Sequence, residues 1–561
     1  MTKMKTKTLF YMALTAVMTT IAACSQDDEP LDAAPKPAAI EFEITDGGFA
    51  DVQTRAVEEG FRTKFTAGDE CGLYIVRNGS LVAENVKLKA SEDKDGTITW
   101  QVVSEDISGA AEGDKYFLYY PYKTTMEVDN EVYPSATDSD DAFFANVINN
   151  WYVAPDQNYY EDYTASDLMT AAGEAKNEDG KLKVSFSLNH KMALAVIEVP
   201  KTKYNFTNVT DGAEYIVPTL VDFSSSITET KPLRMADGTY RIIFNSQNNP
   251  KNTVKGTVPD GRKFTINLVT NLYDCAGKCK RLKVGGGADG TPIEKEHTLQ
   301  VGDFLLKDGN LIKVDQKDAL TAAQKADVAA IVFWSPAETA ADGRTTPASL
   351  TDDKIMAAEH PNCNHGLAVA VKELSNAAMA WQFGAESVEN FRNSDNFTHA
   401  YKGNFASIAT ATGKEDNINR ILGYQNTLVL LAYNDYCYST GKIGKTVKPA
   451  ELLVEFANSN PAPTGSTGWF LPSPKELHML CYKDVDNIYN AYGESNTDTR
   501  EKVNTSLTAV NGKSLSGSYW SSSEENGYPT NAFKVNFSNV KVYHIAKNIS
   551  NNSKARAVLA F

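Results

Sequence analysis

The sequence predicts a multidomain protein with an all-β first half and an α+β second half. Short apolar runs between turn signals fill residues 40–284, a texture typical of β-sandwiches. The glycine-rich run at residues 285–292 interrupts this texture. Beyond it, helix-like segments appear among strands. Four of the six tryptophans lie in this last part: Trp334, Trp381, Trp469 and Trp520.

The strand signal begins at residue 40. Ile40, Phe42 and Ile44 alternate with polar residues, which is the period of a half-buried strand. We therefore expect two successive β-sandwiches, at residues 40–183 and 184–284. Later strand-like runs lie at residues 73–76, 116–120, 184–188, 240–244 and 264–268.

Residues 285–298 are predicted to be a linker, followed by an α+β domain at residues 299–561. The glycine run lacks the Lys-Ser/Thr pair and helix start of a phosphate-binding loop. An alanine-rich segment at residues 318–330 predicts a helix. A second helix is expected after Ser473, because proline follows it and Glu476 has capping-box spacing.

The start of the chain has the layout of a secretory signal. Residues 1–8 are basic, and the apolar stretch at residues 9–23 is shorter than the roughly 20 residues that span a bilayer as a helix. Ile-Ala-Ala-Cys at residues 21–24 resembles a bacterial lipobox, which implies cleavage before Cys24 and acylation of that cysteine. Residues 24–39 are then a flexible tether. An ordinary signal peptide with a chance cysteine is the alternative.

The acidic run behind Cys24 is similar to the surface-export signal of lipoproteins in the Bacteroidetes group, which implies an outer-membrane lipoprotein exposed at the surface. A tether without any such signal is the alternative. Membrane contact is expected through lipid only.

The net charge and the number of cysteines exclude some classes of protein. Removal of residues 1–23 takes away three lysines and moves the net charge from −16 to −19. A net negative chain without a basic cluster is a poor partner for nucleic acid. Besides Cys24 there are six cysteines, too few for a disulfide-dense scaffold. Cys275 and Cys279 are close enough in sequence to form a disulfide, but the sequence does not show whether they do. Cys71 is expected to be a small buried residue.

Two segments resemble Bacteroidales fimbrillins, the subunits of type V pili: residues 65–74, Phe-Thr-Ala-Gly-Asp-Glu-Cys-Gly-Leu-Tyr, and residues 184–193, Val-Ser-Phe-Ser-Leu-Asn-His-Lys-Met-Ala. The resemblance spans about residues 40–285. It implies cleavage after an arginine by a surface protease, loss of the first strand, and insertion of a strand from another pilus subunit. The expected cleavage lies between Arg55 and Ala56, with Arg62 as second choice. Alternatively Arg55 is an ordinary loop residue and the lipid is kept.

Residues from about 300 onward resemble a bacterial relative of the C-type-lectin fold. The resemblance implies binding of a host or bacterial glycan. Trp469 and Trp520 are expected in the core, Glu476 in a helix cap, and Glu524 either in a cap or as a weak candidate for ligand binding. The loop sequences of calcium-dependent lectins are absent, so no calcium is predicted. Four segments carry the resemblance: residues 301–309, 468–477, 519–524 and 556–561.

Other candidate sites predict no metal, cofactor or enzyme activity. His360, Cys363 and His365 lack the distant second ligand pair of a structural zinc site. The lectin-like fold is also used by formylglycine-generating oxidases, but Cys437 and Cys481 lack their motif. Residues 138–141 carry three aspartates, Asp138, Asp140 and Asp141, without the glycine and distal glutamate of an EF-hand.

Together these patterns predict a pilus subunit with an adhesive, lectin-like domain. Residues 555–561 fall within that domain, which leaves no terminal strand to donate and favours a position at the pilus tip. The alternative is a lipid-anchored glycan-binding protein that does not polymerise.

Overall fold

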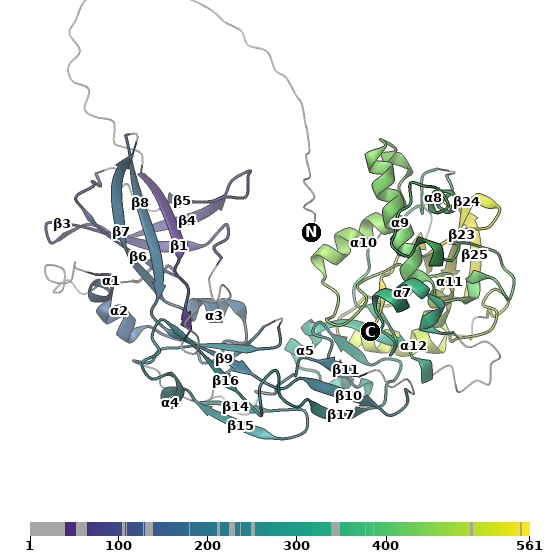
Figure 1. Cartoon of the computed structure of the whole chain (residues 1–561), viewed down its shortest axis with the longest axis horizontal. Coiled ribbons are helices and arrows are strands. Elements are labelled where there is room, and N and C mark those ends of the chain that lie inside the picture. The colour runs from purple at the N-terminus through teal and green to yellow at the C-terminus, as the bar shows by residue number, and fades with distance from the viewer. Residues whose placement is uncertain are drawn as a thin grey trace, which may run out of the picture.

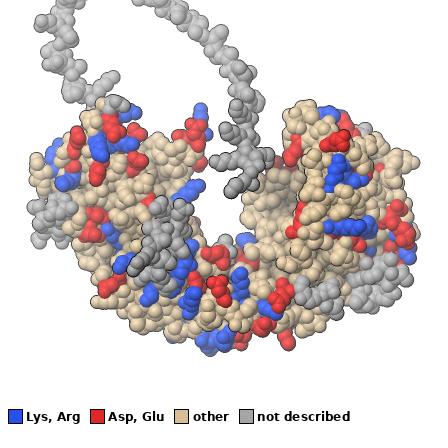
Figure 2. Space-filling view, in the orientation of Figure 1, with Lys and Arg blue, Asp and Glu red and all other residues tan. Residues whose placement is uncertain are grey.

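The computed structural model describes residues 40–51, 64–103, 107, 109–126, 128, 139–178, 180–209, 214–223, 230–235, 237–247, 253–337, 348–375, 377–384, 386–493, 497–549 and 553–561. The first β-sheet forms one arm of a broad U (Figure 1). Smaller sheets form its base, and an α+β region forms the other arm. Figure 2 shows acidic and basic side chains interspersed on the visible face.

The first sheet has seven strands in the order β1-β8-β7-β6-β3-β4-β5. Every neighbouring pair is antiparallel except β1 and β8, which run parallel. The sheet curls so that β1 lies against β5. Its strands are β1 (Ile40–Asp46), β3 (Glu70–Arg77), β4 (Ser80–Glu92), β5 (Ile98–Val102), β6 (Lys115–Tyr120), β7 (Met169–Glu178) and β8 (Lys181–His190).

Three short helices cover the other face and lower end of this sheet (Figure 1). Phe143, Phe144 and Val147 pack there against Tyr74 and Phe117 of the sheet. The core inside the curl is separate and includes Phe42 and Ile44. The helices are α1 (Asp140–Phe143), α2 (Ala145–Asn150) and α3 (Tyr160–Ser166).

Residues 184–188 were expected to open a second sandwich, but they lie in β8 of the first sheet. The reason is their alternation: Val184, Phe186 and Leu188 fill the core inside the curl. The chain enters the next sheet at β9 (Ala193–Glu198), whose residues are all buried. The change of sheet therefore falls near Lys191 rather than at position 184.

The base of the U contains a five-stranded sheet in the order β12-β13-β9-β16-β2, the hairpin β14-β15, and a three-stranded sheet in the order β11-β10-β17. The predicted linker at residues 285–298 includes β17 (Ile293–His297), which pairs in parallel with β10 because Ile293 and His297 are buried. The other elements are β2 (Ala50–Asp51), β10 (Thr202–Phe206), β11 (Tyr215–Val217), β12 (Leu233–Arg234), β13 (Tyr240–Phe244), β14 (Thr253–Thr257), β15 (Lys263–Asn267), β16 (Lys278–Lys283) and α4 (Leu268–Leu272).

The C-terminal region, residues 299–561, contains two five-stranded sheets surrounded by helices (Figure 1). One has the order β19-β18-β20-β21-β27, and the other has the order β22-β23-β24-β25 with β26 paired to β23. Its strands are β18 (Phe304–Leu306), β19 (Leu311–Ile312), β20 (Val328–Trp334), β21 (Leu367–Ala370), β22 (Ala409–Thr410), β23 (Ser518–Glu525), β24 (Tyr528–Asn536), β25 (Lys541–Ala546), β26 (Ser553–Lys554) and β27 (Val558–Ala560).

The helices of this region test two predictions. The helix predicted for residues 318–330 is shorter in the structure, because residues 328–334 are buried in β20. The helix after Ser473 is confirmed, with Ser473 and Glu476 forming the capping box. The helices are α5 (Ala322–Asp327), α7 (Lys354–Glu359), α8 (Val388–Arg392), α9 (Gly423–Ser439), α10 (Lys448–Ser459), α11 (Pro474–Cys481) and α12 (Asp498–Ala509); the 3-10 helices are η2 (Val314–Ala319), η3 (Leu350–Asp352), η4 (Lys402–Asn404), η5 (Asn417–Asn419) and η6 (Ile443–Lys445).

The sheet β11-β10-β17 packs against the C-terminal region. Tyr204 and Tyr215 share an apolar cluster with Val332 and Phe561. The Tyr204 hydroxyl donates to the carbonyl of Leu311 at 3.2 Å. The two regions are therefore joined through packed aromatic side chains. Among the described residues, no helix combines the length and apolar character needed to cross a membrane.

Candidate functional site

Strand β1 occupies an edge of the first sheet and pairs in parallel with β8, with Phe42 opposite Val184 and Ile44 opposite Phe186. The side chains of Phe42 and Ile44 are buried, whereas the polar residues between them are exposed. This is the alternation that the sequence predicts for residues 40–44. β8 borders β1 on one side and β5 lies on the other. We call this position of β1 between β8 and β5 the acceptor groove.

Apolar burial dominates the attachment of β1. Burial of Phe42 and of Ile44 contributes about 1.5–3 kcal/mol each. The ion pair between Glu43 and Lys183, at 3.2 Å, is largely exposed, and such pairs contribute about 0–1 kcal/mol. β1 is therefore held mainly through alternating apolar side chains and main-chain hydrogen bonds.

The end of β1 meets a buried charged group. The Nε2 atom of His190 lies 3.1 Å from an Asp46 oxygen, and its Nδ1 atom lies 2.9 Å from an Asp167 oxygen. The Phe49 ring stacks on the imidazole, with 3.7 Å between centroids. Burial alone lowers the pKa of His190, but Asp167 and Asp46 outweigh it and raise the pKa to about 9. The imidazole is thus cationic at neutral pH. We call Asp46, Asp167 and His190 the His190 cluster.

The segment beyond β1 crosses into the second sheet. The Gly47 amide donates to the carbonyl of Leu188 at 2.8 Å. Gly48 then turns the chain with a φ of 76°, a conformation that glycine adopts without steric cost. Ala50 and Asp51 form β2, which pairs in parallel with β16. Residues 40–51 therefore occupy the edges of two sheets at once.

The predicted processing residues lie outside the described part of the chain. This applies to Cys24, Arg55, Ala56 and Arg62. The described chain stops at Asp51, where β2 ends, and resumes at Lys64. The expected cleavage site therefore lies shortly after the segment that fills the acceptor groove.

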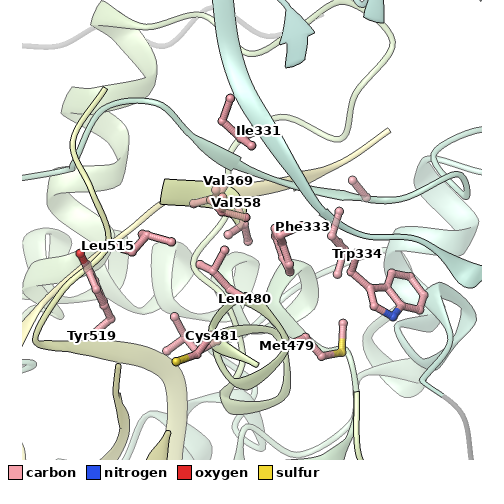
Figure 3. Close-up of a cluster of buried hydrophobic side chains, with 14 of the residues drawn as sticks. Ile331, Phe333, Trp334, Val369, Met479, Leu480, Cys481, Leu515, Tyr519 and Val558 are labelled. Atoms are coloured by element: carbon pink, nitrogen blue, oxygen red, sulfur yellow. The ribbon is translucent and has the colours of Figure 1, made fainter. Parts of the chain in front are cut away.

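The other end of the chain is enclosed. β27 pairs with β21 on one side, and Val558 forms a bridge with Phe470 on the other. Residues 558–561 are at most 1% exposed. Figure 3 shows Val558 within the same cluster as Phe333, Leu480 and Val369. The C-terminal apolar run is part of a core.

The structure places Glu524, the weak ligand candidate, inside the C-terminal region, where 1% of the residue is exposed. Its oxygens accept hydrogen bonds from the amides of Val388 and Glu389, each at 2.9 Å, and it pairs with the buried Lys547. In this structure it caps the start of α8. Glu476 caps α11, and burial raises the pKa of its carboxyl to about 8.

The side chains that resemble metal ligands in sequence have separate partners. His360 contacts the Tyr424 hydroxyl at 3.0 Å, and the Cys363 thiol donates to the carbonyl of Gly465 at 3.1 Å. His365 packs against Phe206 and Tyr215. Within the described ranges, no group of three His, Cys, Asp or Glu residues is placed to hold a metal ion.

Two further predictions concern aspartates and cysteines. Asp140 and Asp141 both pair with Lys191, at 2.8 and 2.6 Å, while Asp138 is not among the described residues. Among the described residues, six cysteines are buried: Cys71, Cys275, Cys279, Cys363, Cys437 and Cys481.

A comparison with known protein families gives a match in the part of the chain that contains most of the acceptor groove. Residues 54–278 match a family model described as fimbrillin-like. The match takes in β8 and β5, which border the groove, while β1 lies just before it.

Two relatives extend over most of the chain. It is 28% identical over 552 residues to the "Putative fimbrium tip subunit Fim1C" of Bacteroides ovatus, covering 93% of this chain and 94% of that protein. A crystal structure of a fimbrial protein from Bacteroides ovatus has 25% identity and a TM-score of 0.41, covering 93% of this chain and 99% of that one. Both relatives are described as fimbrial proteins.

Shorter structural relatives are also fimbrial or adhesion proteins. The fimbrial anchor protein Mfa2 from Porphyromonas gingivalis has 15% identity and a TM-score of 0.19, covering 44% of this chain and 90% of that one. A crystal structure of a "putative cell adhesion protein" from Bacteroides uniformis has 17% identity and a TM-score of 0.25, covering 45% of this chain and 94% of that one.

Sequence reasoning did not identify the His190 cluster. Asp46 follows Ile44 by two residues, so the alternation places it on the inner face of β1. A carboxylate in phase with buried apolar residues is a signal of a buried partner. That partner, however, is His190, far along the chain, and local patterns do not specify it.

Proposed function

We propose that this chain is the tip subunit of a surface pilus and accepts a strand from a neighbouring subunit. Cleavage between Arg55 and Ala56 would detach residues 40–51 from the rest of the chain. A donor strand would then replace β1 beside β8 by β-augmentation. The observation that carries this proposal is the position of β1, a parallel edge strand just before the expected cleavage site.

The burial of residues 558–561 supports a tip position. A shaft subunit must both accept and donate a strand, and an apolar run such as residues 558–561 is a candidate donor. Residues 558–561 are paired on both sides and buried, so donation would require the C-terminal core to open. The similarity to a relative named for the fimbrium tip agrees with this position.

We further propose that the chain is exported as a lipoprotein acylated at Cys24, and that the C-terminal region is a C-type-lectin-like adhesive domain. This region is α+β, and Trp520 is buried in its core as expected, whereas Trp469 is only partly buried and packs against that core. Its ligand class would be a host or bacterial glycan. Binding of the full chain to a glycan array, with the C-terminal region alone as a second sample, tests this adhesive role.

Electron microscopy of pili that carry a tagged copy of the chain tests the position. Gold label at one end of each pilus is expected. Label spread along the shaft would overturn the tip position. Mass spectrometry of the mature protein tests cleavage: a pilus subunit should begin at Ala56, whereas retention of residues 24–55 would favour a lipid-anchored protein that does not polymerise.

A further inference from the structure

The acceptor groove ends at the buried His190 cluster. His190 is 4% exposed and is contacted from both sides by carboxylates, one of which belongs to β1 and the other to the body of the protein. The Asp46 side chain is itself 2% exposed. An acidic residue therefore forms a buried part of the contact between β1 and the groove.

The spacing along β1 places this acid in phase with the apolar side chains. Ile40, Phe42, Ile44 and Asp46 project to the inner side of the strand, opposite Leu182, Val184, Phe186 and Leu188 in the register with β8. A seven-residue strand in the same register thus meets three apolar positions followed by His190.

Departure of residues 40–51 changes the surroundings of His190 on one side only. Asp46 and Phe49 leave, whereas Asp167 stays in contact with Nδ1. An incoming strand with an apolar residue at the Asp46 position would leave the buried imidazolium with one carboxylate instead of two. Removing one partner of a buried charge pair weakens binding by about 10-fold or more. A neutral amide at this position lacks the charge that attracts the imidazolium.

We propose that the acceptor groove selects donor strands in which three alternating apolar residues are followed, two positions later, by an acidic residue that replaces Asp46 on His190. The partner is thus a segment with the pattern apolar-x-apolar-x-apolar-x-Asp/Glu, running parallel to β8. This inference rests on the proposed strand exchange and adds the chemistry by which one donor is preferred over another.

Peptide binding to the cleaved chain tests the selection. A specific protease site is inserted in the full chain within residues 52–63, the chain is cut, and the released N-terminal piece is removed. The probes are fluorescent peptides of residues 40–51 with the natural sequence, with Asp46→Asn and with Asp46→Ala. Relative to the natural peptide, we expect affinities about 3-fold weaker for Asp46→Asn and about 10-fold or more weaker for Asp46→Ala.

The matched control is the Glu43→Gln peptide, which also loses one negative charge but faces the exposed Lys183. Its affinity should change by less than about 2-fold. Equal losses for Glu43→Gln and Asp46→Asn would show that net charge, not His190, governs binding and would overturn the proposal.

A His190→Gln chain provides the second arm. The preference for Asp46 over Asn at this position should fall below about 2-fold, because the cationic partner is gone. An unchanged preference would overturn the proposal. If this variant does not fold, the peptide series on the natural groove decides alone, and equal binding of all its members overturns the selection. Failure of every peptide to bind, by contrast, would contradict the strand-acceptor function itself.

Discussion

The two terminal strands of the described chain, β1 and β27, both bury apolar side chains but differ in how the fold uses them. Both are short runs with buried apolar side chains. β1 has a hydrogen-bonded neighbour on one side only, and β2 continues it onto the edge of another sheet. β27 lies between β21 and Phe470 inside a core. Under the proposed strand exchange, pairing rather than hydrophobicity would decide which of the two strands can leave its sheet.

Removal of β27 gives the largest expected effect. Deletion of residues 558–561 removes three buried apolar side chains larger than alanine, and each such loss in a core costs about 1–5 kcal/mol. We expect the C-terminal region to lose its cooperative unfolding transition, as measured by calorimetry. The matched control is a chain from which residues 40–51 have been cleaved and removed. In this control the unfolding transition of the C-terminal region should persist. A folded C-terminal region without residues 558–561 would mean that β27 is free to be donated.

Truncation of an inward side chain of β1 comes next. Phe42→Ala should lower the free energy of unfolding of the region that contains the first sheet by about 3–5 kcal/mol, because the ring fills the core inside the curl of that sheet. In a cleaved chain the same change should speed the release of residues 40–51, followed by fluorescence of a labelled segment. A loss below about 1 kcal/mol would contradict the dominance of apolar burial.

The buried acid of the C-terminal region gives a pH signature. Burial raises the pKa of Glu476 from 4.5 to about 8, so between these values the folded protein keeps a proton that the unfolded chain has lost. Its contribution to stability is therefore present below pH 4.5 and is lost as pH rises towards 8. Glu476→Gln should remove a pH dependence on the order of a few kcal/mol. Parallel stability curves for the two proteins from pH 5 to 8 would contradict this.

An exposed contact of β1 gives the smallest effect. Glu43→Ala breaks the ion pair with Lys183, whose partners are 56% and 35% exposed. We expect a change in unfolding free energy below about 1 kcal/mol. Chemical denaturation alongside Phe42→Ala measures the contrast, and similar losses from both changes would remove the distinction between the two faces of the strand.

Local sequence patterns predicted which face of a strand is buried and where a helix begins. They did not predict which strands pair with each other. The alternation at residues 40–44 identified the buried side of β1, and the Ser473–Glu476 spacing identified the start of α11. The parallel pairing of β1 with β8 joins residues far apart in sequence, so no local pattern specifies it. The contact of His190 with Asp46 depends on that same pairing. The predicted helix at residues 318–330 was too long because burial in β20 overrides the helix propensity of alanine.

The aromatic junction between the base of the U and the C-terminal region has a mechanical consequence. β17 lies within the predicted linker at residues 285–298. Tyr204, Tyr215 and Phe561 pack between the base of the U and the C-terminal region. A pulling force on the C-terminal region therefore reaches the first sheet through packed side chains and paired strands rather than through a loose tether. The packed side chains and paired strands at this junction therefore fix the orientation of one arm of the U relative to the other.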